Sequence, residues 1–354
     1  MMRNVSKYAH AYMKLNKFVE NNIRLNIHST TLINHHLRTC MTAQKDYDEK
    51  QKFNNRKMPN PFIISGGIFF GLFGTDEEEE KKIEPDVIMT LKRSILLIQK
   101  GEFKKAEQML HLALRQAQTI QDNDGITYVY DVMANLAFDT EDYAKAEKLF
   151  VTVLQRLLSN GIEQDDLRVI HISLKLAKAY VHMEDIKRAE QGYKFCIENL
   201  RAHRIKDNEN ENVITLLGMA ADWYAHMLLS ETRYTEALKY YTEAYDLFIK
   251  VNGVEQEKAV ILLNDLGTVT CLLGQYDKAI VYLSTAEELG NKMPEMVDLA
   301  SIHINLGTVF MRKGLYEEAK KYCTKGKEIA KERNDSDGLI EAKGCLEEIQ
   351  TFLS

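Results

Sequence analysis

The chain has 354 residues and carries 46 Lys and Arg against 52 Asp and Glu, so its net charge is −6 and it is long enough to bury a large core. An acidic chain argues against nucleic acid as a partner, because a phosphate backbone requires a basic surface. The five cysteines include no C-x-x-C pair, which argues against a zinc site and a disulfide framework, so we expect Cys196 and Cys323 to be small buried apolar side chains.

Residues 1–60 are predicted to be a disordered mitochondrial targeting leader. They hold 11 Lys and Arg against 4 Asp and Glu, and residues 1–41 contain a single acid, Glu20. A secretory signal requires an apolar stretch that this segment lacks, whereas a basic, polar and acid-poor composition is typical of a transit peptide. The alternative is a disordered basic tail without a targeting role.

Residues 61–74 form a short apolar segment, and residues 75–85 form an acidic linker. The apolar run 62–73 is shorter than the roughly 20 residues that a helix needs to span a bilayer. Three interpretations stand: a marginal membrane anchor, a segment removed during import, or a strip docked on the rest of the chain. If the run inserts, the basic residues before it and the acidic run after it place the following domain in the intermembrane space.

From residue 86 onward the chain repeats one spacing. Two small residues stand twelve positions apart, with an aromatic or large apolar residue three before the second, and the second small residues follow at steps of 40, 43, 48, 42 and 40. Such a period is typical of stacked helix pairs. We therefore predict that residues 86–354 are all-α, a right-handed α-solenoid of about six helix pairs with a capping helix near 337–352. The six triplets are Ser94, Phe103, Ala106; Ala134, Tyr143, Ala146; Ala177, Ile186, Ala189; Ala225, Tyr234, Ala237; Gly267, Tyr276, Ala279; and Gly307, Tyr316, Ala319.

The last unit shows how each pair is expected to fold. Apolar side chains recur at helical spacing up to Phe310, Gly314 then marks a turn, and a second helix begins near Tyr316. We expect Gly307 and Ala319 to be small because the two helices cross there. The aromatic side chain of Tyr316 is expected to fill the space beside the crossing.

These units resemble the tetratricopeptide repeat family, in the longer variety found in kinesin light chains. The most specific matches are LNDLG followed by GQYDKA within 263–279, and INLG followed by GLYEEA within 304–319. The resemblance implies a solenoid in which the first helix of each pair lines a concave groove.

Three further stretches, 91–115, 126–138 and 172–197, resemble a mitochondrial branch of this family. The order of leader, apolar segment, acidic run and repeats agrees with that branch. The resemblance implies a scaffold of the mitochondrial inner membrane that supports the integrity of respiratory complex III. It also implies binding of the Rieske iron–sulfur subunit and help in clearing its N-terminal fragments.

Polar residues near the small positions of each first helix are the candidates for a peptide-binding groove. Asparagine side chains there can bond the backbone of an extended peptide without requiring a particular sequence. Asn135 and Asn305 are the main candidates, and Trp223 is expected to pack in the core. The full set is Tyr128, Asp131, Asn135, Lys175, Lys178, Asp222, His226, Asn264, Thr268, Asn305 and Thr308.

No sequence motif of a protease, hydrolase, nucleotide site or metal site is found, so we expect no enzymatic activity and no cofactor. Two other classes remain as alternatives. The first is a cytoplasmic cargo or chaperone adaptor of the kinesin light-chain type, although no heptad coiled coil precedes the repeats. The second is an enzyme or protease subunit with an unrecognised site.

Overall fold

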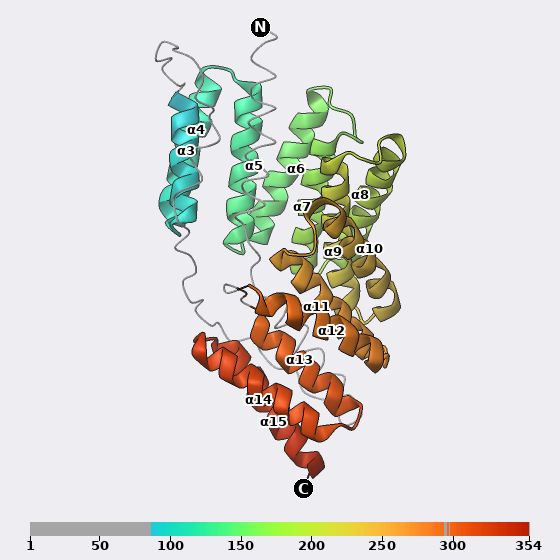
Figure 1. Cartoon of the computed structure of the whole chain (residues 1–354). Helices are drawn as coiled ribbons and strands as arrows, with labels where there is room; N and C mark the ends of the chain where they lie inside the picture. The colour runs from blue at the N-terminus through green and yellow to red at the C-terminus, as the bar shows by residue number, and fades with distance from the viewer. Residues whose placement is uncertain (1–85, 294–295, 297, 354) are drawn as a thin grey trace, which may run out of the picture. The chain divides into compact units, whose positions relative to one another are not determined.

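The computed structural model describes residues 86–293, 296 and 298–353 (Figure 1). Within these residues it contains thirteen α-helices and no strand. The predictions for 1–60, 61–74 and 75–85 fall outside the described residues. The described part divides after Asp185 into two compact units, which are treated separately below.

Unit 1 consists of helices that pack in order along the chain. Helix α3 packs against α4 and α5 against α6, while the α4–α5 and α6–α7 contacts join successive pairs. Its apolar core runs through these helices and includes the fully buried Leu110 and the almost fully buried Phe150. The helices are α3 (Asp86–Gln99), α4 (Phe103–Thr119), α5 (Asn123–Asp139), α6 (Tyr143–Ser159) and α7 (Leu167–His182).

Unit 2 continues the same pattern. Helices α9 and α10, α11 and α12, and α13 and α14 form pairs, and α15 packs on α14 and α13 as the predicted cap. The predicted third pair, α7 and α8, is divided between the two units. The helices are α8 (Ile186–Lys206), α9 (Glu211–Ser230), α10 (Tyr234–Asn252), α11 (Glu257–Leu272), α12 (Tyr276–Asn291), α13 (Leu299–Arg312), α14 (Tyr316–Glu332) and α15 (Ser336–Leu353).

The predicted helix crossings are confirmed by the space around the small residues. A Cβ atom on Gly307 of α13 would overlap the Sγ of Cys323 and lie 3.0 Å from the carbonyl oxygen of Ala319 on α14. A Cβ on Gly267 of α11 would likewise overlap the side chain of Leu283 on α12. The alanines at the second small position are fully buried: Ala106, Ala146, Ala189, Ala237, Ala279 and Ala319.

The turn inside each pair contains one residue with a positive φ. At the α13–α14 turn it is Gly314, with a φ of 81°, a conformation that glycine adopts freely. The N–H of Gly314 donates to the carbonyl of Met311, and the N–H of Leu315 donates to the carbonyl of Phe310, both at 2.9 Å. This pair of bonds ends α13 and starts the next helix. The α9–α10 turn has Thr232 at the same place, with a φ of 59°, which is strained for a β-branched residue.

The prediction that Cys323 is an unpaired apolar residue is wrong. Cys323 of α14 forms a disulfide with Cys345 of α15, 22 residues later. Cys196 is buried and forms no disulfide, as predicted, and Cys271 is also buried without a disulfide. The disulfide joins the capping helix covalently to the last pair, a link that a search for C-x-x-C motifs does not reveal.

Among the described helices, α9 alone is long and apolar enough to cross a membrane by length and composition. Its most apolar stretch is 67% buried inside the fold, where α9 packs against α8 and α10. This burial is typical of a core helix. The short apolar run 62–73, for which a marginal membrane anchor is one of three interpretations, lies outside the described residues.

Candidate peptide-binding site

The predicted groove residues of unit 1 come together between α5 and α7. The Nζ of Lys175 lies 3.6 Å from the Oδ1 of Asp131, whose side chain is 1% exposed. The Nδ2 of Asn135 donates to the backbone oxygen of Asp131 at 2.7 Å and to its Oδ1 at 3.2 Å. These three residues therefore form one bonded group across two helices, and the amide donor of Asn135 is already engaged within the chain.

The other two predicted residues of unit 1 extend this polar face. The Nζ of Lys178 lies 5.5 Å from the ring centroid of Phe138, within range of a cation–π interaction. Burial raises the pKa of Asp139 to about 6, although Lys178 and Lys175 act in the opposite direction. Burial also raises the pKa of the Tyr128 hydroxyl. Lys175 and Lys178 of α7 therefore lie near buried carboxylates of α5.

In unit 2 the predicted residues of α9 belong to a larger charged group, named here the α9–α11 cluster: Asp222, His226, Lys258 and Asp265. The Nζ of Lys258 donates to the Oδ2 of Asp222 at 2.7 Å. The ring of His226 is held by Tyr241 of α10, whose hydroxyl lies 2.7 Å from the Nδ1 of His226. The carboxylates are buried, whereas the His226 side chain is 25% exposed.

The pKa values of the two carboxylates of this cluster shift in opposite directions. For Asp222, burial alone would raise the pKa, but Lys258 and His226 outweigh it and hold the pKa well below its usual range. For Asp265, burial raises the pKa to about 7, because His226 and Lys258 compensate only in part. Lys258, Asp265 and Tyr241 were not predicted as site residues. Asp265 follows Asn264 directly in the LNDLG motif, so a search for charged neighbours of the selected residues would have found it.

The asparagines of α11 and α13 are placed differently from the prediction. The Nδ2 of Asn305 donates to the Oδ1 of Asn264 at 2.9 Å and lies 3.4 Å from the Oγ1 of Thr268. Asn305, Asn264 and Thr268 are each at most 2% exposed. Thr308 is half-buried and donates to the backbone oxygen of Ile304. The bond between Asn305 and Asn264 connects two neighbouring helix pairs, so Asn305, Asn264 and Thr268 lie inside the packing and not on an open surface.

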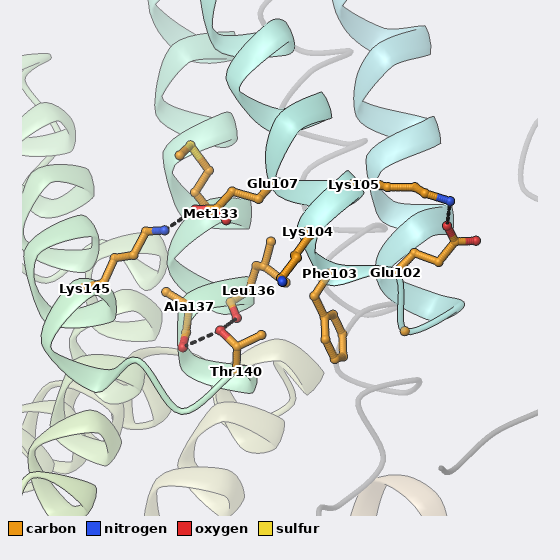
Figure 2. Close-up of a pocket in the computed structure, with 11 residues that line it drawn as sticks. Glu102, Phe103, Lys104, Lys105, Glu107, Met133, Leu136, Ala137, Thr140 and Lys145 are labelled. Atoms are coloured by element: carbon orange, nitrogen blue, oxygen red, sulfur yellow. Dashed lines mark hydrogen bonds and ion pairs between the residues drawn. The ribbon is translucent and has the colours of Figure 1, made fainter.

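A separate hollow in unit 1 lies where α4 begins and α5 ends, and none of the predicted groove residues lines it. Figure 2 shows Met133 and Leu136 of α5 among the residues that line it. Phe103, the middle residue of the first triplet, is 40% exposed at this hollow. On one side Lys145 of α6 reaches across to Glu107 of α4 and forms an ion pair (Figure 2). The hollow is therefore apolar inside and has charged side chains around it.

Sequence comparison identifies relatives over most of the chain. Residues 217–292 and 300–333 match models of the tetratricopeptide repeat. The chain is 36% identical over 298 residues to the mitochondrial tetratricopeptide repeat protein 19 homolog of Drosophila melanogaster, which covers 82% of this chain and 81% of that protein. It is 34% identical over 285 residues to mitochondrial tetratricopeptide repeat protein 19 of Homo sapiens, covering 77% and 74% of the two chains.

Solved structures show the same fold at lower identity. BtubC (BKLC) from P. vanneervenii matches with a TM-score of 0.52 and 19% identity, over 71% of this chain and 93% of that one. Kinesin light-chain repeats from Podosopora anserina match with a TM-score of 0.50 and 14% identity, over 58% and 96%. These similarities concern the fold alone, and they agree with the predicted all-α tetratricopeptide solenoid.

Proposed function

Because this chain belongs to the family of mitochondrial tetratricopeptide repeat protein 19, we propose that it is a mitochondrial scaffold that supports respiratory complex III. In this proposal it binds N-terminal fragments of the Rieske iron–sulfur subunit and helps to clear them, while the bond cleavage is done by a separate protease. The observation that carries the proposal is the 36% identity across 81% of the length of the Drosophila protein.

The charge of the chain supports a basic fragment as the ligand. Residues 61–354 hold 35 Lys and Arg against 48 Asp and Glu, a balance of −13. Segments that direct import into mitochondria are rich in arginine and poor in acids. An acidic body attracts such a segment before contact and speeds its association. Binding of the fragment should therefore weaken as the salt concentration rises.

The proposed location is the inner membrane, with the repeats in the intermembrane space. It rests on the apolar run 62–73, which follows Arg56 and Lys57 and precedes the acidic linker. Protease added to mitoplasts, whose outer membrane is opened, should then digest residues 86–354. Protection of these residues in mitoplasts would contradict the proposed orientation.

The alternative of a cytoplasmic adaptor has weaker support. The relatives that match over most of the chain are mitochondrial proteins. The kinesin light-chain repeats match at 14% identity, a level at which similarity concerns the fold and not the cargo. We therefore retain the mitochondrial proposal and use the adaptor as the outcome that would contradict it.

The partner is tested by crosslinking the protein in intact mitochondria and identifying what is recovered with it. Complex III subunits and Rieske fragments are expected. Recovery of motor or cytosolic components without complex III would overturn the proposal. The purified protein should also leave a synthetic Rieske fragment intact, and metal-independent cleavage of that fragment would contradict a scaffold role.

The polar face of unit 1 is tested by a matched pair of asparagine substitutions. Asn135 on α5 and Asn199 on α8 each donate to a backbone oxygen four residues earlier, at 2.7 and 2.8 Å. Asn135→Ala should weaken binding of a fluorescent Rieske N-terminal peptide several-fold, whereas Asn199→Ala should leave the affinity unchanged. Equal affinities for the two variants would exclude this face of α5 as the binding surface while leaving the choice of partner to the crosslinking result.

A further inference from the structure

Asp222 and His226 of α9 and Asp265 of α11 bring one donor atom each to a common point. The Nε2 of His226 lies 3.5 Å from the Oδ1 of Asp222 and 3.7 Å from the Oδ2 of Asp265. All three donor atoms lie within 4.8 Å of one another, and among the described residues no other group of His, Cys, Asp and Glu does so. A nitrogen and two oxygens from two neighbouring helix pairs thus converge.

The two carboxylate oxygens at this point have no hydrogen-bond partner. Asp222 is 4% exposed and Asp265 is 2% exposed, and both the Oδ1 of Asp222 and the Oδ2 of Asp265 are buried and unpaired. At 3.5 and 3.7 Å the imidazole nitrogen is too far away to form a good hydrogen bond with either. Buried carboxylate oxygens without a partner are costly, so a positive group is expected between them.

The surrounding residues hold these donors in place. The Tyr241 hydroxyl lies 2.7 Å from the Nδ1 of His226, which leaves the Nε2 facing the carboxylates. Lys258 donates to the other oxygen of Asp222 at 2.7 Å, so it neutralises one charge without occupying the common point. Partners of this kind, which orient the imidazole and carboxylate ligands from behind, are typical of metal sites in proteins.

We propose that Asp222, His226 and Asp265 bind a divalent transition-metal ion of the zinc class. A tetrahedral zinc ion holds its ligands at about 2.0–2.2 Å, which places neighbouring donors about 3.3 Å apart. The two distances from the His226 nitrogen, 3.5 and 3.7 Å, are close to that value, while the two carboxylate oxygens, which lie within 4.8 Å of each other, would move together when the ion binds. The imidazole favours zinc and related metals over calcium or magnesium, which prefer six or more oxygen ligands.

The site links two successive helix pairs and keeps one coordination position free. In a solenoid each pair contacts only its neighbours, so an ion held between α9 and α11 stabilises their register directly. The partial exposure of His226 provides the route by which the ion enters, since the carboxylates lie buried. The fourth ligand is then water or a group from a bound partner.

The test uses the untagged full-length protein, stripped of metal with a chelator. Cobalt(II), a spectroscopic substitute for zinc, should give visible absorption bands typical of a four-coordinate site. Zinc should raise the melting temperature, because an ion that binds only the native state stabilises it. His226→Gln should bind one equivalent of zinc less than the wild type and lose both the cobalt bands and the thermal shift.

Two further variants separate a ligand role from a general effect on folding. Tyr241→Phe should keep the number of bound ions but weaken zinc affinity by about 10–100-fold, as expected for a residue behind a ligand. His303→Gln removes another buried histidine, which lies 3.6 Å from Glu287, and should leave zinc binding unchanged. The proposal is overturned if His226→Gln binds as many equivalents of zinc as the wild type, or if zinc does not change the melting temperature of the wild type.

Discussion

Gly307→Ala is expected to destabilise the protein, although alanine is favoured over glycine by about 1 kcal/mol inside a helix. A Cβ at this position would lie 3.0 Å from the carbonyl oxygen of Ala319 and 3.1 Å from the backbone nitrogen of Cys323, and would overlap the Sγ of Cys323. The backbone contacts can be relieved only by moving α14, and the disulfide with Cys345 prevents the sulfur from rotating away. Overpacking typically costs about 1–3 kcal/mol. With the upper part of that range, the free energy of unfolding should fall by about 2 kcal/mol after the gain in helix propensity is subtracted.

Gly218→Ala is the matched control within the same chain. A Cβ there would lie 3.5 Å from the Cβ of Leu247 and 3.8 Å from the carbonyl oxygen of Ala244, which are ordinary contacts. This variant should therefore gain up to about 1 kcal/mol from helix propensity. Urea unfolding followed by circular dichroism measures both variants. A Gly307→Ala protein as stable as the Gly218→Ala protein would refute the helix crossing as the reason for the small residue.

Three other substitutions test the turns, the cap and the pH response. Thr232→Gly should raise the free energy of unfolding by about 1 kcal/mol, because the left-handed conformation is unfavourable for a β-branched residue; an unchanged urea midpoint would contradict this. Cys345→Ala should lower the free energy of unfolding by about 3 kcal/mol under oxidising conditions, because the 22-residue loop is no longer closed. In reductant the variant and the wild type should have similar free energies of unfolding. Burial and Lys325 lower the pKa of His303 to about 4, so the native state holds fewer protons than the unfolded state between pH 4 and 6.5. The stability that this neutral histidine contributes is complete above pH 6.5 and is lost as the pH falls toward 4. Between pH 7 and 4 the free energy of unfolding of His303→Gln should therefore rise by about 3 kcal/mol relative to that of the wild type. Parallel pH profiles of the two proteins would count against this prediction.

The repeat architecture could be predicted because close contact between two helices restricts which residue types fit at the crossing. Where two helices cross closely, only a small residue fits, and Gly307 and Gly267 stand at such crossings. The turn at Gly314 and the capping helix could be predicted for similar local reasons, since the first depends on backbone conformation and the second on the apolar face left by the last pair. Each of these features depends on residues within one unit or its neighbour.

Features that depend on how separate elements dock were not predicted. The disulfide between Cys323 and Cys345 requires α15 to lie on α14 in one register, and a spacing of 22 residues does not indicate this. The burial of Asn264 and Asn305 depends on the packing of one helix pair against the next, whereas both were selected as groove candidates by their positions relative to the small residues, in the groove that the family resemblance implies. Lys258, which bonds Asp222, and Asp265, which lies near His226, were missed for the same reason, since both belong to a different helix pair.

The buried polar contacts between pairs change how binding experiments on this chain should be interpreted. The Asn305–Asn264 bond joins α13 to α11, and Lys258 joins α11 to Asp222 of α9. Because each pair contacts only its neighbours, such bonds determine the angle between pairs and hence the curvature of the surface that a partner meets. A substitution at Asn305 would therefore reduce binding by changing this curvature, without any contact between the asparagine and the ligand. Loss of affinity at Asn305 accompanied by an equal loss of stability indicates this indirect route, whereas loss of affinity at Asn135 with stability unchanged indicates direct contact.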